Sequence, residues 1–135
     1  MTVRLRSDEG RISVFLAIAL LGVLVVIGLS ADGAGRLRAA QHADHIAGEA
    51  ARAGGQAIVL PQAVTGGEKT LDPDRAVAAA QQYLDAAGAA GTVRVEDEVT
   101  LVVTVTATSD TLMLGLIGID RVTVTGSATA HLVTG

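Results

Sequence analysis

Two histidines three residues apart are the first candidates for chemistry in this sequence. His42 and His45 lie in an alanine-rich segment with Asp44 and Glu49 nearby, and imidazole together with carboxylate is a ligand set for zinc. A zinc site needs three or four converging ligands with supporting hydrogen bonds, and the remaining histidine, His131, is far away in the sequence. A solvated helix face explains the pair better, so we expect no metal site.

The other reactive side chains lack the context that catalysis requires. The chain has no cysteine, and none of its serines lies in a nucleophile elbow. Glu96, Asp97 and Glu98 are adjacent at a predicted hairpin turn, where hydrated charges are ordinary, and Gly33 and Gly35 follow an apolar run instead of a strand, which excludes a phosphate loop. We therefore expect no enzyme, no catalytic residue, no cofactor and no small-molecule substrate.

Residues 111–120 (TLMLGLIGID) carry the strongest candidate for a contact surface. They have no charge before Asp120, although they fall between two predicted strands. One interpretation, which we favour, is a short helix or crossover tucked over the open end of the sheet. The other is an exposed surface for a partner or for a membrane, made by Leu112, Met113, Leu114, Leu116 and Ile117.

The N-terminal part of the chain is an apolar run of membrane-spanning length. Residues 12–31 carry no charge, and at about 1.5 Å per residue such a helix is about 30 Å long, the thickness of a hydrocarbon core. Three arginines precede the run and Arg36 and Arg38 follow it, a slight charge bias that Asp8 and Glu9 oppose. Because the flank before the run is very short, we expect a cytoplasmic N-terminus and an extracytoplasmic C-terminal domain in the cell membrane. The alternative is a signal peptide cut after Gly33, at the small-x-small match that begins with Ala31.

Composition limits what can follow this run. The net charge is −4, which gives no basic surface for nucleic acid. Only 1% of the residues are aromatic, so alanine, valine, leucine and threonine must fill one small core.

The remaining elements follow from periodicity and cap signals. Beyond the apolar run, Asp32 is a possible cap for a new helix, and Gly33 and Gly35 permit a bend. Apolar spacing of three and four predicts a helix over about 35–53, ended or kinked by Gly54 and Gly55. Its alanine face either packs on its own domain or lets another helix approach closely, and the sequence leaves both open.

A second helix is predicted over about 74–87, capped by Asp72 and closed by Gly88. Strands follow over 92–96, 99–105 and 121–132, with alternating apolar and hydroxylated residues. The second helix is the available cover for the apolar face of this sheet.

The expected fold is therefore α+β. A long N-terminal transmembrane helix continues into an extracytoplasmic helix, and a small domain follows, in which one helix packs on a three-stranded antiparallel sheet. The expected segments are a basic cytoplasmic leader (1–11), the transmembrane helix (12–31), the alanine-rich helix (32–60) and the α+β domain (61–135).

Several of these segments together resemble a known family. The resemblance rests on Glu9-Gly10 before the apolar run, Ser13-Val14-Phe15 within it, Asp32-Gly33 after it, AARAG over 50–54 and, less specifically, the tail over 114–133. The chain resembles the TadE/TadG-like proteins of tight-adherence (Flp-type) pilus systems in GC-rich bacteria. The resemblance implies a pilin-like fold and a non-enzymatic pseudopilin or pilus-assembly role, with other pilin-like proteins, assembly proteins or further copies of this chain as partners.

The resemblance also implies a processing site. In that family a prepilin-type signal places glycine before the apolar helix, which corresponds to cleavage between Gly10 and Arg11 here. The family commonly has glutamate at the fifth position after that glycine, where this chain has Phe15. The alternative to an assembly component is a stand-alone, membrane-anchored binding module that uses the threonine-rich sheet face or residues 111–120.

Overall fold

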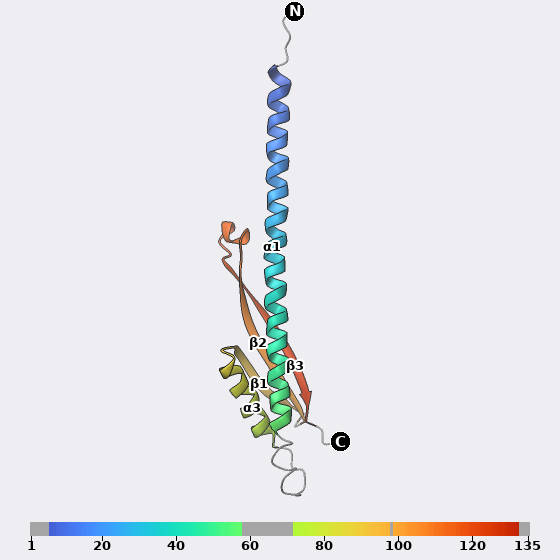
Figure 1. Ribbon diagram of the computed structural model, residues 1–135, viewed down its shortest axis with the longest axis vertical. Coiled ribbons are helices and arrows are strands. Elements are labelled where there is room, and N and C mark those ends of the chain that lie inside the picture. Colours follow the sequence, from blue (N-terminus) through green and yellow to red (C-terminus); the bar gives the residue numbers. More distant parts are fainter. Residues whose placement is uncertain (1–5, 58–71, 98, 133–135) are drawn as a thin grey trace, which may run out of the picture.

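A computed structural model describes residues 6–57, 72–97 and 99–132. Its elements are α1 (Arg6–Ala57), α3 (Pro73–Ala86), β1 (Ala90–Glu96), β2 (Thr100–Asp110), the 3-10 helix η1 (Leu114–Ile117) and β3 (Arg121–His131). Figure 1 shows α1 as a long rod, with the other elements gathered beside its C-terminal half. The expected α+β fold of a long apolar helix, a second helix and a three-stranded antiparallel sheet is confirmed.

α1 is one continuous helix of 52 residues, about 78 Å long at about 1.5 Å per residue. The predicted helix start at Asp32 and the predicted bend at Gly33 and Gly35 are wrong, because the helix runs through all three residues. It also continues past Gly54 and Gly55 to Ala57. Each glycine weakens a helix by only about 1 kcal/mol relative to alanine, which the helix-forming neighbours and the packing of this segment offset.

α3 begins and ends at the predicted signals. The Asp72 carboxylate accepts hydrogen bonds from the backbone N–H groups of Asp74 (3.1 Å) and Arg75 (3.4 Å), and Pro73 occupies the first turn. Gly88, with φ of 65°, follows the last turn, and its N–H donates to the Asp85 carbonyl. The cap predictions at Asp72 and Gly88 are confirmed.

The sheet has the order β1-β2-β3, and both pairings are antiparallel. Val103 stands opposite Val93 of β1 and Ala128 of β3. Leu101, Val103 and Val105 are buried, whereas most of the opposite face consists of exposed or half-buried threonines and charged residues. The predicted alternation of apolar and hydroxylated faces is therefore confirmed.

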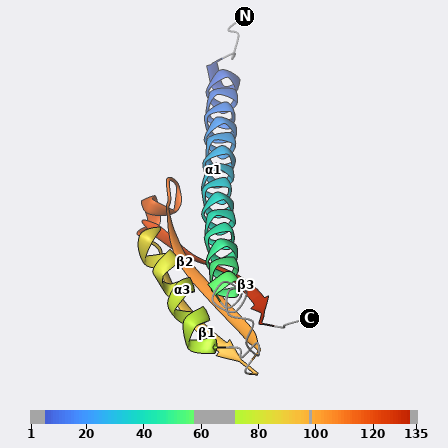
Figure 2. The same cartoon turned by 60° about the horizontal axis from the view of Figure 1, so that its bottom comes forward.

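The cover of the sheet differs from the prediction. We expected the second helix to cover it, but α1 packs along β2 and β3, while α3 packs mainly on α1 and, within the sheet, mainly on β1. The alanine face of α1 therefore packs on its own domain, as one of the two alternatives proposed. Figure 2 shows α3 running along this small sheet. The buried alanines of α1 that join the core are Ala43, Ala47, Ala50 and Ala51.

Alanine suits the buried face of α1 because its small side chain lets the backbones of α1 and β3 come close. Gly126 of β3 lies against the backbone of Ala43 and Asp44, so a Cβ at Gly126 would collide with both. The Asp44 carboxylate also accepts a hydrogen bond from the Ser127 N–H (3.1 Å). β3 is thus held to α1 by backbone proximity and not by large side chains.

Two strands of the sheet extend beyond the third. β1 pairs with β2 only as far as Thr106, whereas β2 and β3 remain paired up to Asp110 and Arg121. Residues 107–124 therefore form a two-stranded arm, which ends in residues 111–120, the tip loop. In Figure 1 this orange-red tip is the part of the domain that reaches furthest toward the N-terminal half of α1.

Candidate functional site

The tip loop is seated on α1 by one carboxylate. Asp32 accepts hydrogen bonds from three successive backbone N–H groups, those of Leu112 (2.5 Å), Met113 (2.9 Å) and Leu114 (3.0 Å). The N-terminal end of η1 thus meets an anionic group, which accepts from the N–H groups that have no partner within the helical turn. The residue that we expected to cap a new helix in its own segment instead caps a turn 80 residues later.

The environment of Asp32 favours its ionised form. The residue is only 8% exposed. Hydrogen bonds from the N–H groups of Leu112 and Leu114, opposed by desolvation and assisted by the Met113 N–H, lower the pKa of Asp32 below its usual value of 3.8. At neutral pH the tip loop is therefore held by a carboxylate and not by a carboxylic acid.

A glycine on α1 makes room for the second contact of the tip loop. The Met113 side chain lies where a Cβ at Gly28 would be, so this close approach requires glycine on the helix. Gly28 lies one helical turn before Asp32. Together the two residues fix the tip loop beside the end of the apolar run of α1.

The predicted contact residues of the tip loop are divided between two sides. Met113 and Leu114 are half-buried, turned toward α1, whereas Leu112, Leu116 and Ile117 are 71%, 77% and 73% exposed. The favoured interpretation is confirmed in part, since residues 114–117 form a short 3-10 helix, but it is wrong for these three side chains, which are not tucked over the sheet. Ile119 was not predicted, and at 45% exposed it extends the surface. We call Leu112, Leu116, Ile117 and Ile119 the apolar patch.

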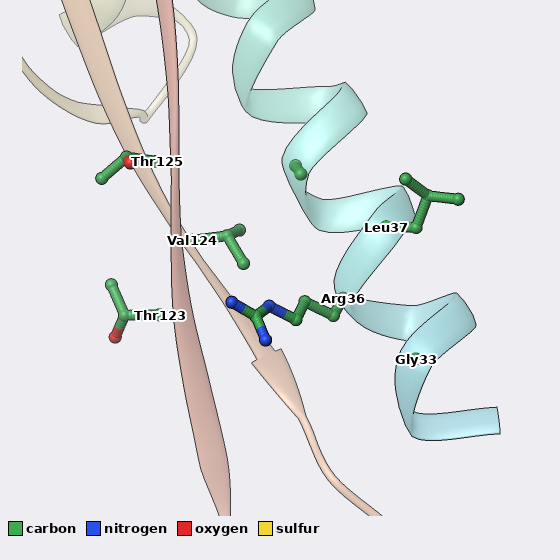
Figure 3. A pocket seen from close by; sticks show the side chains of 7 residues that line it. Gly33, Arg36, Leu37, Thr123, Val124 and Thr125 are labelled. Carbon is green, nitrogen blue, oxygen red and sulfur yellow. The ribbon is translucent and has the colours of Figure 1, made fainter. Parts of the chain in front are cut away.

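An open groove separates the arm from α1 just beyond the tip loop. It has a volume of about 480 Å³ and is lined by Gly33, Arg36, Leu37, Ala40, Thr123, Val124 and Thr125. Figure 3 shows the Arg36 side chain extending from α1 toward Val124 of β3. Arg36 is exposed, and among the described residues it forms no ion pair.

The candidate metal ligands remain apart. His42 and His45 are exposed on α1, Asp44 bonds Ser127, and His131 lies near Thr100 at the far end of the sheet. Within residues 6–57, 72–97 and 99–132 no three histidine, cysteine, aspartate or glutamate side chains converge. Glu96 pairs with Arg94 (2.7 Å), Asp97 is in the turn with φ of 52°, and Glu98 lies outside the described residues.

Apart from its C-terminal end, where Met113 lies against Gly28, the apolar run of α1 is not covered by the domain. α1 is long and apolar enough to cross a membrane, and its most apolar window is wholly unburied. Gly10 and Arg11 are exposed in the first turns of the helix, and cleavage between them stays a prediction. Comparison with protein-family models, curated proteins and solved structures finds no match for this chain.

Sequence reasoning missed the role of Asp32. The available signal was one acidic residue directly after a charge-free run, followed by helix-compatible sequence. That signal indicates a boundary, but the partner amides in 112–114 became identifiable only once the arm was seen beside α1.

Proposed function

We propose that this protein is a non-enzymatic, membrane-anchored pseudopilin-like component of a tight-adherence type pilus or of a related secretion or assembly machine. The N-terminal half of α1 holds the chain in the cell membrane, with the N-terminus in the cytoplasm. The sheet, α3 and the second half of α1 stand outside the membrane and work by contact with other pilin-like subunits, assembly proteins or further copies of this chain.

One observation supports this proposal: a single continuous helix is apolar and uncovered in its N-terminal half and packs in the core of the domain with its C-terminal half. The large apolar side chains between Ile12 and Leu29 are exposed, whereas Ala43, Ala47 and Ala50 of the same helix are fully buried in the domain. A bare apolar helix requires lipid or other helices around it. Because the helix is continuous, a force or a displacement at the anchor is passed directly to the folded domain.

The rival, a stand-alone binding module, has less support. No groove found among the described residues lies on the threonine-rich face alone, and the groove between α1 and the arm is open. The surfaces that stand out are the exposed half of α1 and the apolar patch, which suit contact with lipid or with other apolar surfaces.

Deletion of the gene in its native host tests the proposal. We expect loss of surface fibres or of a secreted product, restored by the unchanged chain but not by one with Leu21→Arg and Val25→Arg in the anchor. A matched control is Leu37→Arg, since Leu37 is exposed on the same helix outside the apolar run. Fibres and secretion that survive the deletion would remove the assembly role.

A further inference from the structure

The apolar patch lies at the level where the apolar run of α1 ends. Asp32, which holds the N–H groups of Leu112, Met113 and Leu114, is the first residue after the run, and Gly28, against Met113, is inside it. Figure 1 shows the tip reaching this part of α1, with the rest of the domain further away. A bilayer that surrounds residues 12–31 therefore has its surface beside the tip loop.

The exposed side chains of the tip loop are large and hydrophobic, as in a segment that contacts lipid or another apolar surface. Leu116 and Ile117 are among the most exposed large hydrophobic side chains outside α1, and Leu112 and Ile119 adjoin them. Clustered exposed apolar residues indicate an interaction site. The nearest apolar phase is the one that the exposed residues of α1 themselves require.

Most backbone N–H groups of the tip loop already have hydrogen-bond acceptors in the protein, so the loop can leave water at little cost. The N–H groups of 112, 113 and 114 donate to Asp32, while those of Thr111, Leu116, Gly118 and Ile119 donate to carbonyls of the loop. The Thr111 hydroxyl donates to the Ile119 carbonyl. Irregular backbone cannot approach hydrocarbon with its polar groups unpaired, and here most backbone donors of the loop are paired, either with Asp32 of α1 or within the loop.

Basic residues follow the apolar run within two helical turns. Arg36 and Arg38 are exposed on α1, about 8 to 11 Å beyond Ala31 at about 1.5 Å per residue. Arg121 also lies at the base of the tip loop, paired with Asp110 (3.3 Å) beside Asp120. Headgroups occupy the outermost 5 to 8 Å or so of each leaflet, so Arg36 and Arg38 lie at or just above lipid phosphates, which guanidinium groups bind well.

We propose that the tip loop is a second, shallow membrane anchor: Leu112, Leu116, Ile117 and Ile119 insert into the interface of the leaflet from which α1 emerges, with Arg36 and Arg38 near the level of the lipid phosphates. This inference rests on the membrane anchorage in the proposed function. Two points of attachment, the span and the tip loop, hold the domain at one tilt to the membrane. They also prevent the whole molecule from rotating about the axis of α1. Removing the tip loop from the lipid would then be a required step if the subunit leaves the membrane.

Depth-dependent fluorescence quenching tests this insertion directly. The chain has no cysteine, so single cysteines at Ile117, at Leu20 in the span and at Arg94 on β1 each carry one environment-sensitive probe. All three positions are exposed, so the label does not disturb the core. The full chain is reconstituted in vesicles of phosphatidylcholine and phosphatidylglycerol that contain lipids spin-labelled near the headgroup or deep in the acyl chain.

We expect the Leu20 probe to be quenched best by deep spin labels, the Ile117 probe by shallow ones, and the Arg94 probe by neither. Interfacial segments insert about 5 to 10 Å, which separates the first two patterns. A Leu116→Cys variant, 77% exposed, repeats the measurement in case the probe at Ile117 perturbs the loop.

Three results would overturn the inference. If the Leu20 probe is quenched but the Ile117 and Leu116 probes behave like Arg94, the span stands and the second anchor falls. If the tip probes are blue-shifted, insensitive to lipid quenchers and revert on dilution of protein in the vesicles, a second copy covers the patch. If the Leu20 probe is not quenched either, the anchorage of the proposed function fails as well.

Discussion

Asp32 determines where the tip loop lies. A carboxylate offers two acceptor oxygens, and here Oδ1 serves Leu112 while Oδ2 serves Met113 and Leu114. An asparagine has one acceptor oxygen and would turn an NH₂ group toward the remaining amides. The charge and the second oxygen are therefore both required at this position.

We expect the tip loop to loosen when Asp32 is neutralised. The lowered pKa means that its contribution to stability is full above the unfolded-state value of 3.8 and is lost as pH falls through the lower folded-state value. In detergent micelles, the amide signals of 112–114 should titrate with a midpoint below this usual aspartate pKa of 3.8. Asp32→Asn should abolish this titration and speed amide exchange at these residues roughly tenfold or more.

Asp44→Asn is the matched control, because Asp44 accepts a hydrogen bond from one backbone N–H group, that of Ser127, which lies on β3 outside the tip loop. It should leave the exchange of 112–114 unchanged. A midpoint at or above the ordinary aspartate value would contradict the assigned role of Asp32.

At the scale of elements, the domain depends on close approach between α1 and its neighbours. An isolated two-stranded hairpin is marginally stable at best, so the arm needs its contacts with α1. The core offers few large side chains, the largest fully buried ones being Leu84, Leu101, Val103 and Val105. Small residues on α1 bring the backbones together and so increase the contact that these side chains make.

Two adjacent glycines provide a test of this packing. A Cβ at Gly54 would collide with Leu101 and lie 2.8 Å from the Ala76 carbonyl oxygen, whereas a Cβ at Gly55 meets nothing within 4 Å. Gly54→Ala should lower the free energy of unfolding by about 1 to 3 kcal/mol. Gly55→Ala should leave it unchanged or raise it by up to about 1 kcal/mol. Denaturant unfolding in detergent, followed by circular dichroism, measures both, and equal effects would refute the close approach at Gly54.

At the scale of the whole molecule, the exposed apolar half of α1 is unfavourable in water and favourable in an apolar environment. Its apolar side chains from Ile12 to Leu29 are largely uncovered, and the hydrophobic effect penalises such a surface in water by about 25 cal/mol per Å². In a bilayer the same surface is stabilising.

Charges in the middle of this segment should prevent insertion. Leu21→Arg and Val25→Arg each oppose it by about 2.5 to 3.5 kcal/mol at a span centre. We expect the double variant to leave the membrane fraction after centrifugation and carbonate extraction, whereas Leu37→Arg stays membrane-bound. Recovery of the unchanged chain in the soluble fraction would contradict the anchor.

Local physics made several elements readable from the sequence. The carboxylate of Asp72 and the ring of Pro73 act on their own turn, so the start of α3 was predictable, as was the chain reversal at Gly88 and Asp97. The alternation along β2 and β3 specified a two-faced sheet, because successive strand side chains point to opposite sides. The length and apolarity of residues 12–31 likewise depend only on neighbours in the chain.

Tertiary structure decided everything that joins distant residues. Alanines at 43, 47 and 50 suit a lipid-embedded helix pair and a domain core equally well, and only the position of the sheet shows that they are core. Asp32 had an ordinary local use as a cap, but its amide partners lie 80 to 82 residues away. The exposure of Leu116 and Ile117 likewise depends on the arm, in which β2 and β3 extend beyond the end of β1. Sequence patterns report which surfaces are apolar, and long-range packing determines which of them are covered.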